Sequence, residues 1–363
     1  MKKVLILANI AKGFYDLRQE LLKELVKKYE VYVAVPDSPD IVYIENLNCK
    51  IEKTPFERRG MNPFKDFKLF ITYIKLLNKI KPDIVLSYTI KPNMYGGLAC
   101  RLKKVPQIAN ITGLGTAVDT EGILKNILII MYKITMKKTK CIFFQNTNNL
   151  NVFKKNKLVK ENYRLIPGSG VNLIRYPLEK YPNNDIIKFL FIARIMKVKG
   201  IDEYLKAAKI IREKYKNTEF GILGTYEQDT YKEKINEYEQ NGFVKYEGFK
   251  ADIREDIKNS NCIILPSHCG EGMANVLLEA SATGRPIIAT DIHGCRETID
   301  DGINGYICKV KDTQSLADAI EKFINLSFNE QKQMGLKGRE KMEKEFDRNI
   351  VVKAYLEEID KCI

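Results

Sequence analysis

Two acidic residues, Glu271 and Glu279, flank the expected start of one helix, and this arrangement suits the binding of a phosphorylated ligand. Glu271 and Gly272 belong to the loop before the helix, which we expect over residues 274–283. The first turn of a helix offers unpaired N–H groups and a partial positive charge, and glycine lets phosphate approach the backbone. A carboxylate beside phosphate would repel it, so we expect Glu271 to face neutral sugar hydroxyls beyond the phosphates. Glu279 stands in an apolar segment, where ribose hydroxyls would supply the donors that a buried acid needs.

Each acid also has a purely structural interpretation. Glu271 could cap the helix, and Glu279 could pair with a lysine. The two acids together, in a loop followed by a helix, favour a sugar-nucleotide site over these separate roles.

The histidines and cysteines are the other residues whose types could bind a ligand, in this case a metal. The two histidines lie beside cysteines, as His268-Cys269 and His293-Gly294-Cys295. Adjacent ligands are poor zinc-site spacing, and we interpret the eight scattered cysteines as reduced, buried thiols. The chain has no Asp-x-Asp motif, so paired carboxylates for Mg²⁺ or Mn²⁺ are not available in that form. We therefore expect neither a metal nor a cofactor.

The elements that must position these residues alternate between short apolar strands and amphipathic helices. This alternation predicts an α/β protein with parallel, doubly wound sheets. In the first half we expect strands at 4–8, 31–35, 84–87, 107–111 and 141–145, and helices at 16–28, 64–79, 95–102 and 123–136. In the second half we expect strands at 189–193, 219–223, 244–246, 262–266, 286–290 and 305–308, and helices at 201–214, 231–241, 253–259, 274–283 and 349–359.

A break in this alternation divides the chain into two domains. Residues 166–185 contain Gly, Pro and Asn, and we interpret them as a linker. Residues 1–165 and 186–345 then form two Rossmann-like domains whose sheets face a central cleft, with ligands at the carboxyl ends of the strands. The last segment, 346–363, is expected to be a helix that packs back on the N-terminal domain.

The positive charge of the chain is confined to its first half. Residues 1–165 have 30 Lys and Arg against 14 Asp and Glu, whereas residues 166–363 have 30 against 32. No base-reading module accompanies these cations, so nucleic acid is not an expected partner. We expect the basic half to meet an anionic membrane surface, with the segments 64–81 and 123–140 as candidate interfacial helices. The alternatives are a solvated lysine-rich face and helices that only pack on the sheet.

With these motifs the chain resembles the family-4 retaining glycosyltransferases of the GT-B fold. Glu271 and Glu279 match the Glu-x7-Glu signature of that family, and Thr283-Gly-Arg-Pro and Asp301-Gly-Ile-Asn-Gly look like the rest of its second domain. The segment from Phe191 to Gly200 is similar to the motif whose arginine and lysine hold the donor diphosphate, and those residues here are Arg194 and Lys199. Arginine binds phosphate in a bidentate manner and lysine adds a point charge, which agrees with this role.

The resemblance extends these roles to further residues in both domains. Tyr246-Glu-Gly-Phe resembles the loop that contacts the base, and Gly224 ends the strand where the nucleoside would pass. The implied diphosphate site is Arg194, Lys199, Gly272, Met273, Ala274 and Gly13, the last in a loop after the first strand. The implied nucleoside site is Glu279, Gly224, Gly248 and Phe249.

Two first-domain segments are similar to one bacterial branch of the family, which builds glycans on polyprenyl diphosphate. They are Tyr88-Thr-Ile-Lys-Pro-Asn-Met-Tyr-Gly-Gly and Asn110-Ile-Thr-Gly-Leu-Gly-Thr-Ala. Many relatives have a sugar-facing histidine in the region of Thr112, which this chain lacks. The candidates for that side of the site are Thr112, Gly113 and Lys91.

The resemblance implies a metal-independent, retaining hexosyltransferase with Glu271 as its catalytic acid residue. The expected reaction moves a hexose or N-acetylhexosamine from a nucleotide-diphosphate sugar, with uridine as the expected base, to a lipid-linked glycan. The expected location is the inner face of the cell membrane, with peripheral attachment. The alternatives are a nucleotide-sugar epimerase of the same fold and a non-catalytic nucleotide-sugar-binding subunit.

Overall fold

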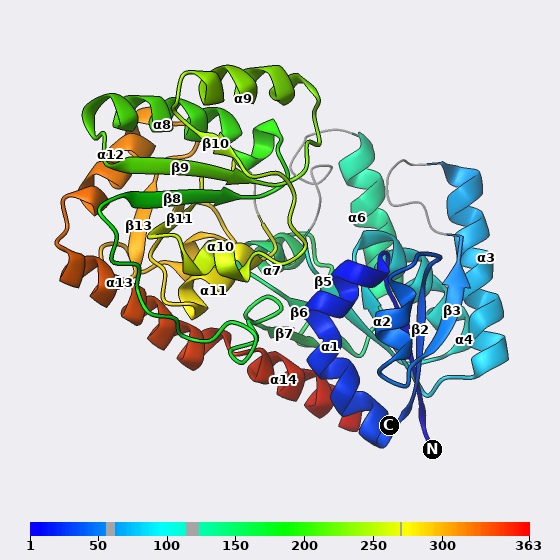
Figure 1. Cartoon of the computed structure of the whole chain (residues 1–363). Coiled ribbons are helices and arrows are strands. Elements are labelled where there is room, and N and C mark those ends of the chain that lie inside the picture. Colours follow the sequence, from blue (N-terminus) through cyan, green and yellow to red (C-terminus); the bar gives the residue numbers. More distant parts are fainter. Residues whose placement is uncertain (56–61, 114–122, 269–270) are drawn as a thin grey trace. The chain divides into compact units, whose positions relative to one another are not determined.

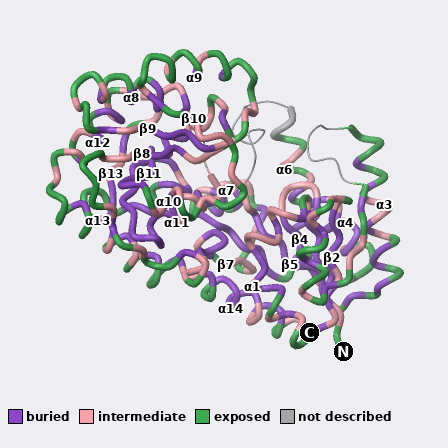
Figure 2. Tube along the Cα trace, viewed as in Figure 1, coloured by how far each residue is buried: buried purple, intermediate pink, exposed green. Residues whose placement is uncertain are grey.

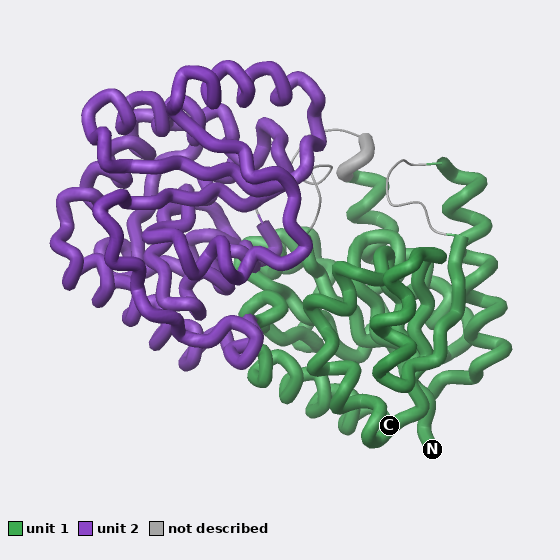
Figure 3. Tube along the Cα trace, viewed as in Figure 1, with its two compact units in different colours: residues 1–170, 348–363 green, residues 171–347 purple. Residues whose placement is uncertain are grey.

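The computed structural model describes residues 1–55, 62–113, 123–268 and 271–363. The chain forms two compact units, one made of residues 1–170 and 348–363 and the other of residues 171–347 (Figure 3). Each unit is an α/β structure with its own buried sheet (Figure 2).

Unit 1 is built on a seven-stranded parallel sheet with the order β3-β2-β1-β4-β5-β6-β7 (Figure 1). Alternate residues of a strand point to opposite faces, so Val4 and Ile6 pack with helices α1 and α14 while Leu5 and Leu7 pack with α3 and α4. The strands are β1 Lys3–Leu7, β2 Glu30–Pro36, β3 Lys50–Thr54, β4 Ile84–Tyr88, β5 Gln107–Ile111, β6 Cys141–Phe144 and β7 Tyr163–Leu165. The helices are α1 Ala11–Lys28, α2 Ile41–Glu45, α3 Pro63–Ile80, the π-helix η1 Pro92–Gly96, α4 Gly97–Lys103, α6 Ile123–Met136, α7 Thr147–Lys155 and α14 Arg348–Asp360.

Unit 2 has a six-stranded parallel sheet with the order β10-β9-β8-β11-β12-β13. Helices α8 and α12 pack against each other, as do α11 and α13 (Figure 1). The strands are β8 Ile187–Ile192, β9 Thr218–Leu223, β10 Lys245–Tyr246, β11 Cys262–Leu265, β12 Ile287–Thr290 and β13 Gly305–Cys308. The helices are α8 Ile201–Lys214, α9 Thr230–Gln240, α10 Arg254–Lys258, α11 Asn275–Ala282, α12 Thr313–Ile324 and α13 Phe328–Lys341, with shorter turns η2 Lys197–Lys199, η3 Arg296–Thr298 and η4 Met342–Phe346.

The predicted fold class, two Rossmann-like domains with parallel sheets, is confirmed. The strands that the sequence analysis missed, β3 and β7, are the two edges of the first sheet. Strand β3 contains a single apolar residue, Ile51, and β7 is only three residues long. A central parallel strand is buried on both faces and reads as an apolar run, whereas these edge strands do not.

The boundary between the units differs from the linker expected at 166–185. The chain passes into unit 2 after Gly170 and leaves it after Asp347. The residues after Gly170 do not form a free connection, because Tyr176 and Tyr181 are only 7% and 4% exposed. The Tyr181 hydroxyl also donates to the Asn261 carbonyl at 3.0 Å, so burial of these tyrosines makes the segment part of unit 2.

The last helix, α14, is part of unit 1. Its Tyr355 is 1% exposed, and its ring centroid lies 4.3 Å from that of Phe143 in strand β6. Arg348 donates to the carbonyl of Asp16 and to the carboxylate of Glu20 in α1, both at 2.9 Å. An aromatic contact and a largely buried ion pair therefore hold the carboxyl-terminal helix on the first sheet.

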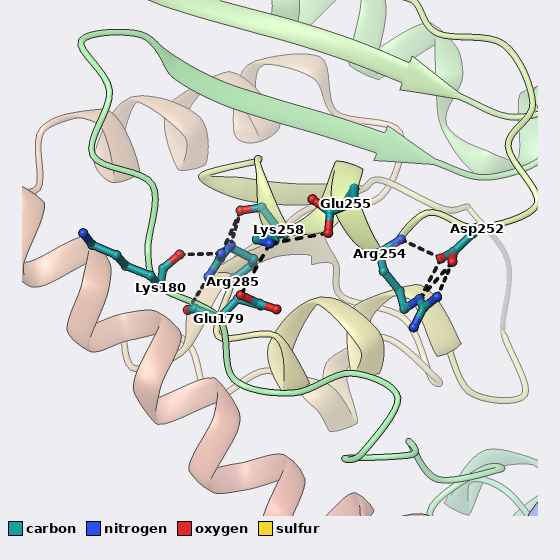
Figure 4. Close-up of polar contacts among 7 residues, drawn as sticks. All are labelled: Glu179, Lys180, Asp252, Arg254, Glu255, Lys258 and Arg285. Atoms are coloured by element: carbon teal, nitrogen blue, oxygen red, sulfur yellow. Dashed lines mark hydrogen bonds and ion pairs between the residues drawn. The ribbon is translucent and has the colours of Figure 1, made fainter.

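A fully buried arginine, Arg285, ties the beginning of unit 2 to its interior (Figure 4). Its guanidinium donates to the carbonyls of Glu179 at 3.2 Å, Lys180 at 2.8 Å and Lys258 at 2.7 Å. Burial lowers the pKa of Arg285 to about 10, which still leaves the side chain charged near neutral pH. A buried charge is costly unless it is hydrogen bonded, and these carbonyls supply the bonds.

Candidate functional site

The carboxyl ends of β8 and β11 bring two of the predicted residues into direct contact. Lys199, in η2 after β8, forms an ion pair through Nζ with Oε1 of Glu271, in the loop after β11. The two side chains are 17% and 18% exposed. Ser267 Oγ also donates to Glu271 Oε1 at 3.0 Å. The cation expected at the diphosphate and the acid expected at the sugar are therefore in direct contact, and the acid also accepts a hydrogen bond from a serine that the sequence did not point to.

A glycine allows this contact by letting two backbones come close together. Gly200 has φ +78°, and a Cβ atom on it would lie 1.9 Å from the Pro266 carbonyl oxygen. The backbone N–H of His268 donates to the Val198 carbonyl at 2.8 Å. Glycine at position 200 is required by both its left-handed conformation and the lack of space. The segment with Lys199 is thus held against the loop that leads to Glu271.

The turn after β12 supports Glu271 from the other side. The backbone N–H of Glu271 donates to the His293 carbonyl at 3.1 Å. Gly294 has φ +88°, and a Cβ atom there would lie 2.5 Å from the carbonyl oxygen of Glu271. Thr290 Oγ1 donates to the carbonyl of Ser267 at 2.5 Å. In the sequence, Gly294 stands between two possible metal ligands, and a glycine in the turn that follows an expected strand is the signal that could have predicted this close approach.

The amino terminus of α11 has no side-chain cap, so some of its backbone N–H groups are available to a ligand. The N–H of Ala274, which was expected to bind phosphate, is not one of them. The backbone N–H of Ala274 donates to the Gly294 carbonyl at 2.8 Å, so it is not available to a phosphate. Met273 and Ala274 are 7% and 4% exposed, which buries their side chains in the core of unit 2. The first-turn N–H groups of Asn275 and Val276 have no acceptor within the helix, as helix geometry dictates. The Ala274 N–H therefore has an acceptor within the chain, the contacts expected at Gly272 and Met273 remain predictions, and Asn275 and Val276 are added as candidates.

Glu279 lies within α11 beside a tyrosine from the beginning of unit 2. Burial, and after it the negative charge of Glu279, raise the pKa of the Tyr176 hydroxyl above its ordinary value. Tyr176 precedes β8 in the chain, so nothing in the local sequence around Glu279 pointed to this neighbour. The last residue of the helix is Ala282, and Gly284, which has φ +79°, follows as the expected terminating glycine.

Two of the residues expected at the nucleoside, Gly224 and Gly248, come together at the carboxyl ends of β9 and β10. The N–H of Gly224 donates to the Gly248 carbonyl, and the Tyr246 hydroxyl donates to the Gly224 carbonyl, both at 2.9 Å. A Cβ atom on Gly224 would lie 1.8 Å from the Ala193 carbonyl oxygen, so this position also requires glycine. Phe249 is 68% exposed and is not packed into the core.

Arg194 follows β8 and is more exposed than Lys199. Its Nη1 atom lies 3.6 Å from Oε2 of Glu227, and its side chain is 44% exposed. Water screens the charge of an exposed guanidinium, so its attraction to a phosphate is weaker than that of a buried cation. Of the two predicted phosphate-binding cations, Lys199 is the one held in a largely buried position.

The candidates in unit 1 follow the carboxyl ends of its strands, with one correction. Gly13 lies in the first turn of α1, and not in a loop, because the helix begins at Ala11 and not near residue 16. Ala11 and Phe14 are buried in the core, which extends the helix over this glycine at modest cost. Thr112 and Gly113 directly follow β5, and Gly113 has φ +156°.

Lys91 follows β4 and is paired within unit 1. Its Nζ atom lies 2.7 Å from Oδ1 of Asp66, and the two side chains are 16% and 12% exposed. Tyr95 donates to the other oxygen of Asp66 at 3.1 Å. Asp66 therefore fixes the lysine, and a role of Lys91 toward the sugar would have to include this carboxylate.

The possible zinc ligands have other partners in the described part of the chain. His268 Nε2 lies 2.7 Å from Oε2 of Glu203, and His293 Nδ1 lies 3.2 Å from Oε1 of Glu297. Burial raises the pKa of the Cys295 thiol well above its ordinary value, and Cys269 lies outside the described residues. No group of three potential metal ligands is present among the described residues. The absence of a metal remains a prediction.

Comparison with known proteins connects this geometry to a family. Residues 3–146 match the family model described as "Glycosyl transferase 4-like", and residues 179–341 match that described as "Glycosyl transferases group 1". The chain is 29% identical to N,N'-diacetylbacillosaminyl-diphospho-undecaprenol alpha-1,3-N-acetylgalactosaminyltransferase of Campylobacter jejuni, over 98% of each chain. It is 28% identical to the capsular polysaccharide biosynthesis glycosyltransferase CapM of Staphylococcus aureus, over 96% of this chain and 94% of CapM.

A solved structure shows the same fold at lower sequence identity. The Anabaena protein HepE, crystallised with UDP and glucose, superposes with a TM-score of 0.83 at 16% identity, covering 99% of this chain and 100% of that one. The two family models together span most of the chain, one in each unit, and the residues of the Glu-x7-Glu signature lie in the second. The chain belongs to the family-4 glycosyltransferases of the GT-B fold.

Proposed function

We propose that this glycosyltransferase moves a hexose or N-acetylhexosamine from a UDP-sugar to a lipid-linked glycan, with retention of anomeric configuration. The observation that supports this best is the contact between Lys199 and Glu271 beside the uncapped start of α11. It gathers a cation, an acid and backbone N–H groups at the carboxyl edge of one sheet, where α/β proteins bind ligands. The lipid-linked acceptor is proposed from the Campylobacter relative, whose name specifies a diphospho-undecaprenol substrate.

In the proposed reaction, the residues of unit 2 hold the donor and stabilise its leaving group. Lys199, Arg194 and the first-turn N–H groups of α11 bind the diphosphate, and Glu279 accepts hydrogen bonds from the ribose. The bond between the anomeric carbon and the phosphate oxygen breaks, and a bond from the acceptor hydroxyl forms on the same face of the sugar. The proton of the acceptor passes to the leaving phosphate. Preorganised cations and dipoles stabilise the charge that develops on this phosphate, so no metal or other cofactor is required.

Binding of the donor is proposed to break the Lys199–Glu271 ion pair and to give each group a new partner. Both side chains are largely buried, so water cannot fully compensate their charges. If one of them moved away, the other would be left as an unpaired charge in a poorly solvated position. In the proposed complex a phosphate replaces Glu271 as the partner of Lys199, and the sugar hydroxyls replace Lys199 as the partner of Glu271. The free protein thus holds both groups in place with their charges mutually satisfied.

We also assign the protein to the inner face of the cell membrane, attached peripherally. Within the described residues, no helix has both the length and the apolar character that a membrane span needs. The basic first half provides electrostatic attraction to anionic lipid. Because the basic half contains no base-reading module, we do not propose a nucleic-acid partner.

A transfer assay with two acceptors tests this function. Incubation with UDP-sugars should transfer the sugar to a polyprenyl-diphosphate-linked glycan and leave a free monosaccharide unmodified, with an α-linked donor giving an α-linked product. A parallel thermal-shift screen over nucleoside diphosphates should give the largest shift with UDP, because a ligand that binds only the folded state stabilises it. Conversion of the donor to its epimer without acceptor would favour the epimerase alternative. Nucleotide binding without any transfer to the lipid-linked glycans tested would favour the non-catalytic subunit.

Metal removal provides a separate prediction. Exhaustive treatment with EDTA should leave most of the transfer activity, because cations and helix N–H groups are proposed to stabilise the leaving diphosphate. The initial rate should be measured before and after chelation, with a metal-dependent glycosyltransferase as a positive control for removal. A loss of activity that Mg²⁺, Mn²⁺ or Zn²⁺ restores would show that the mechanism needs a metal.

A further inference from the structure

Unit 1 has a cavity of about 520 Å³ between helices α4 and α6, away from the edge where the reaction is proposed to occur. Gln107, the first residue of β5, and Lys140, the residue before β6, both line it, so it opens at the amino-terminal edge of the sheet. Gln107 and Thr139 form a buried polar floor, with Thr139 Oγ1 donating to Gln107 Oε1 at 3.2 Å. Its volume is in the range of small-ligand sites. Ligands of the proposed reaction bind at the carboxyl edge, so this cavity has no role assigned so far.

The cavity is lined by cations and by no acidic residue. Arg101, Lys104, Lys138 and Lys140 are the charged residues of its wall. The surrounding segments, 97–111 and 123–140, contain eight Lys and Arg and no Asp or Glu. None of the four cations forms an ion pair with any residue that the structure describes. Four uncompensated positive charges around one hollow favour an anionic ligand.

An alternative to ligand binding is that these cations neutralise the negative carboxyl ends of the two helices. Arg101 partly has this role. Its Nη1 atom donates to the carbonyl of Ile134 in α6 at 2.7 Å, which uses one of five donors. The ammonium groups of Lys104, Lys138 and Lys140 make no hydrogen bond to a described carbonyl. Two helix ends contribute roughly half a negative charge each, which four full positive charges exceed.

Exposed apolar side chains lie beside this basic hollow. On α6, Ile127, Ile130 and Ile134 are 46%, 57% and 45% exposed, and Leu102 on α4 is 59% exposed. The three isoleucines are spaced by three and four residues, so they form one stripe along the outer face of α6. Lys133 and Lys137 are exposed on the same helix and the turn after it. An apolar stripe with lysines beside it is typical of a helix that lies in a membrane interface.

We propose that this cavity binds the phosphate of an anionic membrane phospholipid while the isoleucine stripe of α6 enters the acyl region. The cations account for the phosphate, and the stripe accounts for an apolar chain attached to it, which inorganic phosphate lacks. The site would hold unit 1 on the membrane by the edge of its sheet that does not bind the donor. The inference rests on the proposed function for its expectation of work at a membrane, but it concerns a different site and a different lipid from the acceptor.

Vesicle binding by the full-length protein tests the proposal. The probes are vesicles of phosphatidylcholine alone and of phosphatidylcholine with phosphatidylglycerol, in co-sedimentation. The pocket variant is Lys138→Glu with Lys140→Glu, and the control is Lys155→Glu with Lys160→Glu, which changes the net charge equally on exposed lysines of the same unit. We expect wild type and control to bind the anionic vesicles similarly. The pocket variant should bind them about tenfold or more weakly, since each lysine near an anionic surface contributes roughly a factor of five.

Two further measurements separate a lipid from free phosphate and from the proposed catalysis. Ile130→Ser with Ile134→Ser should weaken binding to anionic vesicles, whereas millimolar inorganic phosphate should not displace the wild-type protein. All variants should keep the wild-type affinity for UDP and the wild-type melting temperature. A change in vesicle binding can then be attributed to the lipid site and not to the donor site or to misfolding. Equal loss in the pocket and control variants would mean that only diffuse charge matters, and the proposal would be wrong. Displacement by inorganic phosphate, or unchanged binding in the isoleucine variant, would equally overturn the lipid assignment.

Discussion

Glu271→Gln is expected to lower kcat about a hundredfold or more while UDP affinity stays at the wild-type level or rises slightly. Glutamine keeps the size of the side chain and its hydrogen bond with Ser267 Oγ, but removes the negative charge beside the reacting sugar. A charge that acts mainly on the transition state changes kcat more than it changes ground-state binding. Because Glu271 pairs with Lys199 in the free protein, its neutralisation also leaves the lysine more available to phosphate.

Glu279→Gln is expected to behave in the opposite way. If its carboxylate accepts ribose hydrogen bonds, the loss of that charged acceptor should weaken UDP binding by about 1.5–3 kcal/mol. Calorimetry with UDP and steady-state kinetics with the UDP-sugar measure the two effects, and Glu255→Gln, on the exposed surface of α10, is a matched control. If Glu271→Gln lost UDP affinity and Glu279→Gln kept it, the two roles would be reversed.

Lys199→Ala is expected to produce a comparably large loss, of about 2–4 kcal/mol in donor binding and transition-state stabilisation. The ammonium group is largely buried, so water cannot replace its interaction with the diphosphate. The variant also leaves Glu271 without its cation beside the phosphates, which adds repulsion to the lost attraction. Arg194→Ala should weaken donor binding in the same direction by a smaller amount, because Arg194 is half exposed.

The contact between Lys199 and Glu271 makes this prediction more specific. In Lys199→Ala combined with Glu271→Gln, UDP affinity should be higher than the sum of the single effects predicts, since the unpaired carboxylate is gone. Lys197→Ala, which changes an exposed lysine in the same turn, is the control and should keep wild-type affinity and rate. Additive effects in the double variant would show that the ion pair does not matter to donor binding. Wild-type affinity in Lys199→Ala would remove this lysine from the diphosphate site.

The amino-acid sequence by itself determined the fold class and the elements of the site. Apolar runs such as those of β4 and β11 are buried on both faces, and this double burial is what makes central parallel strands visible in a sequence. Gly284 stopped α11 where the sequence predicted, because its left-handed conformation follows from local geometry. The places of Glu271 before the helix and of Glu279 within it likewise follow from the local sequence of a loop and a helix. These features are local, and local patterns are what a sequence displays.

Tertiary structure decided which of these residues touch one another. Lys199 and Glu271 are 72 residues apart, and they meet because β8 and β11 are adjacent in the parallel sheet and their following loops are locked together at Gly200 and Pro266. The roles of Ser267 and Gly294 around Glu271, and of Tyr176 beside Glu279, depend on the same kind of long-range packing. Strand order and backbone approach are set by burial of the whole sheet and not by neighbours in the chain, so a one-dimensional pattern carries no record of these contacts.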